Sequence, residues 1–279
     1  MARRIRNRMN ERKIRVNGLN LNFVDYGGAG NPPLLFIHGG SAHGHWWDFI
    51  GPHFTDRFHA LAIDLRGHGD SEWTEEWEYG TRHYIADLDE LIDNWGLGAP
   101  VLVGHSMGGH NVMVYASLHP EKLRAMVAID SPSDYPERAV DFLRGISERP
   151  GKRFKSLEEA IANFKMIPRE TLAHPEVLRH AASHTFRQTP EGEWIHKLDR
   201  RTTIREPINL GGDLSKITCP ALYVKVLKSP FPTLEQTKAM VAMMPRGKLA
   251  TLDDSYHHAM FDNPAGLTAI LKDFLRDIT

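Results

Sequence analysis

Ser106 has the surroundings that best fit a chemical role, because it lies at the centre of a Gly-His-Ser-Met-Gly segment. Three apolar residues at 101–103 precede this segment, and a helical pattern follows it at 111–118. This order predicts a strand, a sharp turn and a helix that begins at the serine, an arrangement called a nucleophile elbow. The helix dipole there stabilises developing negative charge. We therefore predict a nucleophilic serine rather than an ordinary serine in a glycine-rich turn.

The elements that must position this serine alternate along the chain. Short, wholly apolar runs are typical of parallel strands that are buried on both faces, and amphipathic helical patterns separate them. Strands are expected at residues 13–16, 19–26, 34–37, 58–63, 101–103, 123–129, 221–227 and 248–252, the first two as a hairpin. Helices are expected at residues 46–54, 81–95, 111–118, 233–244 and 264–276, and a polar loop at 253–262. The alternation predicts an α/β protein with a doubly wound, mostly parallel sheet of eight strands.

The alternation stops between residues 133 and 212. This stretch shows no apolar strand, and about 80 residues is more than a connection needs. Its helical patterns lie at residues 137–147, 156–166 and 175–183. We expect a helical cap, inserted after the strand at 123–129, over the sheet edge that holds Ser106. The predicted domains are a core of residues 1–132 and 213–279 and a cap of residues 133–212.

The bulk composition excludes several classes of protein. The formal net charge of −1 gives no global field for nucleic acid or an anionic membrane. Cys219 is the single cysteine, so we expect no internal disulfide and a reducing, cytoplasmic compartment. Residues 1–15 are rich in arginine but no apolar segment follows, which indicates a solvated basic tail rather than a secretory signal. No apolar run approaches the roughly 18 residues of a membrane span.

Four segments carry a resemblance to a known family. They are His-Gly-Gly at 38–40, Asp-Leu-Arg-Gly-His-Gly-Asp-Ser at 64–71, Gly-His-Ser-Met-Gly-Gly at 104–109, and His257 ahead of Pro264. In this order and spacing, the chain resembles an α/β-hydrolase over nearly all of its length. The resemblance implies the α/β-hydrolase fold and a serine nucleophile, requires no cofactor, and says little about the substrate.

The resemblance also implies a catalytic histidine in the loop after the last strand, to take the proton of Ser106. Two histidines, His257 and His258, are adjacent in that loop. The family pattern of a histidine, six residues and a proline selects His257, whereas a loop shifted by one residue would select His258. If His257 is the catalytic base, the side chain of His258 is expected to point away from Ser106.

The sequence departs from the common family pattern at the third catalytic residue. Most members carry an acid after the strand equivalent to residues 221–227, at a position that falls on Ser229 here. Asp130 is the substitute, because it ends the strand that follows the nucleophile helix, where a subset of the family places its acid. Both strand ends open on the same edge of the sheet, so Asp130 can reach the second nitrogen of the histidine.

Two rivals for the acid remain, Asp253 and Asp254, which lie on the histidine's own loop and fit better as turn residues. The segment at 127–130 and the cap after it are also similar to a subgroup of α/β-hydrolases that open acetamidomethylene-succinate. This subgroup places its acid at the strand end occupied here by Asp130.

Backbone groups complete the expected machinery. The N–H groups of Met107 and Gly40 are the expected donors to an oxyanion. The histidines in the family motifs, His38, His68 and His105, suggest a metal site as an alternative. No carboxylate or thiol cluster accompanies them, so we interpret them as structural histidines and expect no metal.

The cap is expected to define the substrate. The predicted pocket residues are Trp46, His105, Arg144, Trp194 and His258. Further candidates are the aromatic Trp47, Phe142, Phe164 and Phe186, and the arginines Arg138 and Arg149, which could hold a substrate carboxylate. Core packing for the aromatic residues and a solvated surface for the arginines are the alternatives.

The sequence predicts a serine hydrolase that cleaves an ester, or an amide, of a small carboxylic acid. Ser106, His257 and Asp130 would form and hydrolyse an acyl-enzyme. The alternatives are a cofactor-independent dioxygenase with a His–Asp dyad, a carbon–carbon bond hydrolase, and a non-enzymatic receptor on the same fold. The expected partner is a small-molecule ester or amide, with no nucleic acid and no membrane, and a homodimer remains possible.

Overall fold

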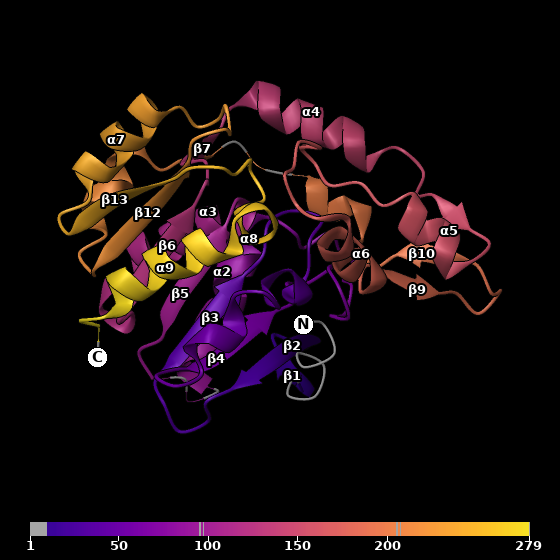
Figure 1. Ribbon diagram of the computed structural model, residues 1–279, viewed down its shortest axis with the longest axis horizontal. Coiled ribbons are helices and arrows are strands. Elements are labelled where there is room, and N and C mark those ends of the chain that lie inside the picture. Colours follow the sequence, from indigo (N-terminus) through magenta and orange to yellow (C-terminus); the bar gives the residue numbers. More distant parts are fainter. Residues whose placement is uncertain (1–9, 95, 97, 205, 207, 279) are drawn as a thin grey trace.

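The computed structural model describes residues 10–94, 96, 98–204, 206 and 208–278 (Figure 1). Residues 1–9 of the predicted basic tail and Trp95, the predicted end of one helix, lie outside the described residues. The remainder of the tail forms the first strand. Among the described helices, none combines the length and the apolar character needed to cross a lipid bilayer.

Eight strands form the main sheet. They are β1 (Asn10–Val16), β2 (Leu19–Gly27), β3 (Pro33–Ile37), β4 (His59–Ile63), β5 (Val101–His105), β6 (Ala125–Ile129), β12 (Ala221–Val226) and β13 (Gly247–Leu252). Their spatial order is β1-β2-β4-β3-β5-β6-β12-β13. The predicted hairpin of β1 and β2 is antiparallel, as is the pairing of β2 with β4, and all other neighbours pair in parallel. The predicted mostly parallel, eight-stranded sheet is confirmed.

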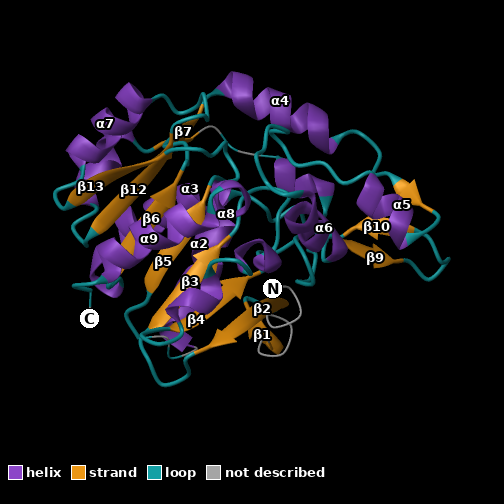
Figure 2. Cartoon of the chain, viewed as in Figure 1, coloured by secondary structure: helices purple, strands orange, loops and turns teal. Residues whose placement is uncertain are grey.

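Helices cover both faces of the main sheet (Figure 2). The first face carries α2 (Thr81–Asn94), α3 (Met107–Leu118) and α7 (Leu234–Met243). The second carries α8 (Ala259–Asp262), α9 (Pro264–Leu275) and the 3₁₀ turns η1 (Gly44–Trp47) and η2 (Gly51–Phe54). In β3, Leu35 packs in the first of these cores, and Leu34 and Phe36 pack in the second. Burial on both faces explains why the parallel strands are wholly apolar.

Two local predictions are wrong. The helix predicted at 46–54 is instead the two short turns η1 and η2, with Pro52 at the start of the second. Proline has no N–H group to donate within a continuous helix, so the helical hydrogen bonds are interrupted there. The loop predicted at 253–262 ends in the helical turn α8, which is too short to produce a periodic pattern.

Residues 133–212, which we call the insertion, follow β6 and precede β12 in the sequence. The insertion lies outside the main sheet (Figure 1). Its helices are α4 (Glu137–Ser147), α5 (Leu157–Ala162) and α6 (Pro175–Ser183), and its strands are β7 (Asp134–Tyr135), β8 (Arg153–Phe154), β9 (Phe186–Gln188), β10 (Trp194–His196) and β11 (Ile208–Asn209). Helices α4 and α6 match the predicted ranges. The prediction that the insertion contains no strand is wrong, because strands of two or three residues are too short to show alternation.

The strands of the insertion form two small sheets. Strands β8, β10 and β9 make a three-stranded sheet, and β11 pairs with β7. The second pairing joins the place where the chain leaves the main sheet to the place where it returns, with Tyr135 opposite Ile208. The insertion is thus closed at its base.

Candidate active site

Ser106 lies between β5 and α3 with φ of 52° and ψ of −117°, a backbone conformation that L-residues rarely adopt. The two glycines of the segment permit this turn. A Cβ atom at Gly104 would lie 2.4 Å from the backbone of Gly108, and one at Gly108 would lie 2.4 Å from the carbonyl oxygen of Ile37. Neither position has room for a side chain, as expected for a nucleophile elbow.

The structure brings His257 and Asp130 together across 127 positions of sequence. The Nδ1 atom of His257 lies 2.7 Å from Oδ2 of Asp130, which is fully buried beyond the end of β6. The rival acids lie elsewhere, since Asp253 and Asp254 are exposed and Asp254 forms an ion pair with Lys228. Of the three candidate acids, Asp130 is the one that contacts His257.

Lys225 is a site residue that the sequence analysis missed. Its Nζ atom lies 2.8 Å from Oδ1 of Asp130 and 2.8 Å from the carbonyl oxygen of Ser229. Lys225 is only 2% exposed, so its charge and that of Asp130 offset each other away from water. A lysine inside an otherwise apolar strand, β12, was the available signal.

A cavity of about 450 Å³ opens between the main sheet and the insertion. Its core wall includes Gly40, Ser41, Ser106, Met107, Asp130 and His257. Its insertion wall includes Tyr135, Arg138, Phe142, Leu143, Ile146 and Ile167. In the described part of the chain, Ser106 and His257 share this cavity without a hydrogen bond between their side chains. Such bonds often form only once substrate is bound.

The loop that carries Gly40 is held by His38. The backbone N–H of Leu65 donates to Nε2 of His38, and Nδ1 of His38 lies 2.7 Å from the carbonyl oxygen of Gly39. This pattern assigns the proton to Nδ1, and burial lowers the pKa of His38, which favours the neutral ring. Gly40 and Met107, the predicted oxyanion donors, both line the cavity.

Three predicted pocket residues do not line this cavity. Trp46 is buried in the core, with its ring centroid 4.8 Å from that of Phe261. Arg144 projects to the surface and pairs with Asp141, because it lies on the outer side of α4. Trp194 packs in a separate small core of the insertion. Phe142 and Arg138, named among the wider candidates, do line it.

The two remaining pocket predictions, His105 and His258, are also corrected, because both side chains are buried and neither lines the cavity. His105 Nε2 lies 2.8 Å from the carbonyl oxygen of His257, so His105 supports the loop of the candidate base. His258 Nε2 lies 3.0 Å from the carbonyl oxygen of Pro168, and burial lowers the pKa of His258 to about 3. His258, the alternative base, therefore points away from Asp130.

Known proteins resemble this chain in sequence and in overall fold. A sequence model of the α/β hydrolase fold family matches residues 32–169. An esterase of Mycobacterium tuberculosis is 26% identical over 268 residues, which cover 94% of this chain and 88% of that protein. Epoxide hydrolase 4 of Mus musculus is 30% identical over 158 residues, which cover 56% of this chain and 42% of that protein. The crystal structure of E-2-(acetamidomethylene)succinate hydrolase superposes with a TM-score of 0.83 at 22% identity, covering 96% of this chain and 99% of that one.

The chain is a hydrolase of the α/β hydrolase fold. The predicted fold class is thereby confirmed. The relatives carry the names of enzymes that act on different bonds, an ester in one case and an epoxide in another. Less than half of the mouse epoxide hydrolase is matched. The fold and these relatives therefore leave the bond that this enzyme cleaves to be argued from its own site.

Proposed function

We propose that this hydrolase cleaves an ester, or an amide, of a small carboxylic acid through an acyl-enzyme. The observation that carries the proposal is that Ser106, in its strained elbow, and His257, paired with Asp130, line one cavity. A serine hydroxyl needs a base, and an imidazole held by a carboxylate is the group that serves it in serine hydrolases.

In the proposed mechanism, Nε2 of His257 takes the proton of Ser106 as its Oγ atom attacks the substrate carbonyl. Asp130 accepts the hydrogen bond of Nδ1, so it fixes the tautomer and stabilises the imidazolium that forms. The backbone N–H groups of Gly40 and Met107 stabilise the oxyanion, each donor being worth about 10²–10³ in rate. His257 then returns the proton to the leaving group and activates the water that releases the acid.

Lys225 acts in this scheme as a positioning residue. Its ammonium group holds Oδ1 of Asp130, which leaves Oδ2 directed at His257. It also anchors the carbonyl oxygen of Ser229, the position where most family members carry their acid. The lysine thus links the loop after β12 to an acid supplied from β6, and its charge offsets that of the buried carboxylate.

The insertion serves as the proposed cap over the cavity. Its wall is largely apolar, with Phe142, Leu143 and Ile146 on α4 and Ile167 beyond α5. A volume of about 450 Å³ falls within the range of about 300–1,000 Å³ that is usual for small-molecule sites. We infer an acyl or alcohol group of modest size and apolar character, with Arg138 as the cation at the same wall.

The test is hydrolysis of p-nitrophenyl esters of increasing acyl chain length, measured with wild type, Ser106→Ala and Ser133→Ala. Ser133 does not line the cavity, so its variant is the matched control. We expect turnover by wild type and by Ser133→Ala, and loss of turnover in Ser106→Ala. Turnover that survives in Ser106→Ala contradicts the acyl-enzyme. If wild type cleaves no ester or amide, oxygen consumption with ring substrates tests the dioxygenase alternative.

A further inference from the structure

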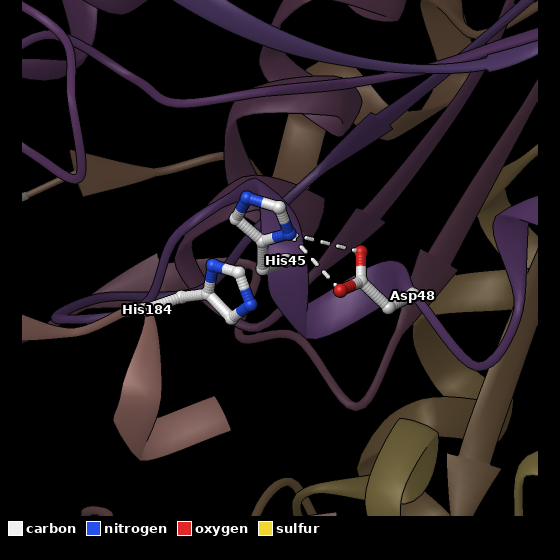
Figure 3. A group of neighbouring side chains, drawn as sticks. All are labelled: His45, Asp48 and His184. Atoms are coloured by element: carbon white, nitrogen blue, oxygen red, sulfur yellow. Dashed lines mark hydrogen bonds and ion pairs between the residues drawn. The ribbon is translucent and has the colours of Figure 1, made fainter. Parts of the chain in front are cut away.

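A second group of polar side chains gathers away from the catalytic cavity, where η1 meets the end of α6. His45 belongs to η1, Asp48 follows that turn, and His184 follows α6. Figure 3 shows the two imidazoles side by side, with a ring nitrogen of each on the side of the Asp48 carboxylate. One donor atom from each residue lies within 4.8 Å of the other two. None of the three lines the catalytic cavity.

The geometry points to a zinc site formed by His45, Asp48 and His184. Two imidazoles and one carboxylate are the ligand types that Zn²⁺ takes, with water in the fourth position. Zinc bonds of about 2.0–2.1 Å in a tetrahedron place neighbouring ligand atoms about 3.3 Å apart. Nδ1 of His45 already lies 3.0 Å from Oδ2 of Asp48. The remaining separations are within 4.8 Å, so His184, whose ring centroid lies 3.7 Å from that of His45, would have to rotate to bring its nitrogen to bonding distance.

Burial distinguishes this group from an ordinary surface cluster. His45 is 5% exposed and Asp48 is 1% exposed. Among the described residues, the imidazole of His184 makes no hydrogen bond. An imidazole whose ring nitrogens make no hydrogen bond, beside a buried carboxylate, can offer a lone pair to a cation.

A second layer of side chains orients the three ligands, as it does in most metal sites. Glu11 Oε1 lies 3.2 Å from Nε2 of His45, which directs the other ring nitrogen towards Asp48. The hydroxyl of Tyr26 donates to Oδ1 of Asp48 over 2.9 Å, and Nε2 of His180 lies 2.6 Å from Oδ2. A histidine that donates one N–H to a carboxylate and keeps the other nitrogen for the metal is the usual zinc arrangement.

The competing interpretation is that hydrogen bonds alone, without a metal ion, hold this group of side chains together. Burial disfavours the charged form of His45, but its hydrogen bonds to Asp48 and Glu11 raise its pKa to about 10. Zinc must therefore replace the proton on Nδ1 of His45, and its binding competes with that proton. The two interpretations differ in whether His184 contributes to stability only when metal is present.

Zinc at this place would join the insertion to the core. His45 and Asp48 belong to the segment between β3 and β4, and His184 belongs to the insertion. Since the site is outside the catalytic cavity, its effect is on stability rather than on the chemical step. Zinc that binds only the folded chain stabilises it by mass action.

The experiment measures zinc content and thermal unfolding of the full chain purified without a polyhistidine tag. Wild type, His184→Ala, Asp48→Asn and His53→Ala are stripped with EDTA, dialysed with ZnCl₂ and then dialysed against metal-free buffer. His53 is exposed on the neighbouring turn η2 and is the matched histidine control. His184 is only half-buried, so its variant stays informative if Asp48→Asn folds poorly.

We expect wild type and His53→Ala to retain about one zinc per chain and to gain roughly 5 °C or more in Tm at saturating zinc. His184→Ala and Asp48→Asn should lose both the bound zinc and the shift in Tm. Absence of retained zinc in wild type overturns the proposal in favour of hydrogen bonds alone. Retention by His184→Ala, or loss in His53→Ala, places the zinc elsewhere and overturns it equally.

Discussion

In the part of the chain that the structure describes, two buried aspartates are each paired with the Nδ1 atom of a histidine. Asp130 lies 2.7 Å from His257, and Asp48 lies 3.0 Å from His45. The surroundings differ, because the first pair lies beside Ser106 on a cavity, whereas the second is closed in by histidines, Tyr26 and Glu11. An Asp–His pair does not by itself identify an active site. A strained serine and space for a substrate supply the distinction.

The partners of the two carboxylates sharpen this contrast. The second oxygen of Asp130 accepts a hydrogen bond from the ammonium group of Lys225. A protonated amine has no lone pair with which to bind a metal. Asp48 is surrounded by imidazoles, which give up a proton and accept a cation instead. The chemistry open to each aspartate follows from its neighbours.

Removal of the proposed nucleophile should have the largest effect on activity. We expect Ser106→Ala to lower kcat/KM for its best ester by at least about 10³-fold, because the residual rate comes from binding and the oxyanion donors alone. Stopped assays of ester hydrolysis, on variant protein whose folding has been confirmed, measure this loss of kcat/KM. A smaller loss would contradict the comparison of the two Asp–His pairs, because Ser106 would then not be what makes the Asp130–His257 pair catalytic.

Matched amide substitutions test the two aspartates directly. Asp130→Asn should lower kcat by about 10²–10⁴-fold, because the amide favours the wrong tautomer of His257. Asp48→Asn should leave kcat per folded molecule within about 3-fold and lower the Tm, because a buried hydrogen-bonded pair is broken. Steady-state kinetics and thermal unfolding of both variants check this. Equal effects on kcat would show that the pairs are not functionally distinct.

Replacement of Lys225 tests the positioning role. We expect Lys225→Met to lower kcat by about 10-fold, equivalent to roughly 1.4 kcal/mol, with little change in KM. It should also destabilise the fold by about 3–5 kcal/mol, since the Asp130 charge loses its buried partner. Lys228→Met is the control, because Lys228 lies on the adjoining loop and pairs only at the surface. The stability loss should shrink when Lys225→Met is combined with Asp130→Asn, as a double-mutant cycle would show.

The effect limited to the fewest substrates is expected at the wall formed by the insertion. Phe142 is 64% exposed yet lines the cavity, so it is available to contact a substrate. Phe142→Ala should lower kcat/KM for longer acyl chains by about 10-fold and leave the shortest esters unchanged. Trp194→Ala is the control, because Trp194 packs away from the cavity. A uniform loss across chain lengths would argue against contact between Phe142 and the acyl group.

The sequence predicts the main sheet and the elbow at Ser106 because local patterns encode them, whereas His257 and Asp130 were selected through the resemblance to the α/β-hydrolases. Apolar runs mark strands buried on both faces, and the glycines at 104 and 108 mark a turn without room for side chains. The choice of acid also followed from strand order, since β6 and β12 are neighbours in a parallel sheet.

The residues that the sequence did not reveal depend on contacts between distant segments. Lys225 meets Asp130 across 95 positions, so a lysine in an apolar strand marks the residue, but its partner is known only once β6 and β12 pair. The cavity wall depends on which side of α4 faces the main sheet, so Arg144 was chosen and Phe142 was only one of several candidates. The spacing of His180 and His184 was likewise uninformative without Asp48 opposite them.

The pairing of β7 with β11 has a consequence for how this enzyme can be re-engineered. Because Asp134 lies opposite Asn209, the two ends of the insertion are adjacent in space. The residues between Asp134 and Asn209 therefore connect to the main sheet as a single hairpin loop would, whatever their number or sequence. Grafting a foreign segment onto these two positions would give the proposed nucleophile a different entrance, without extending or shifting any strand that carries the proposed catalytic groups.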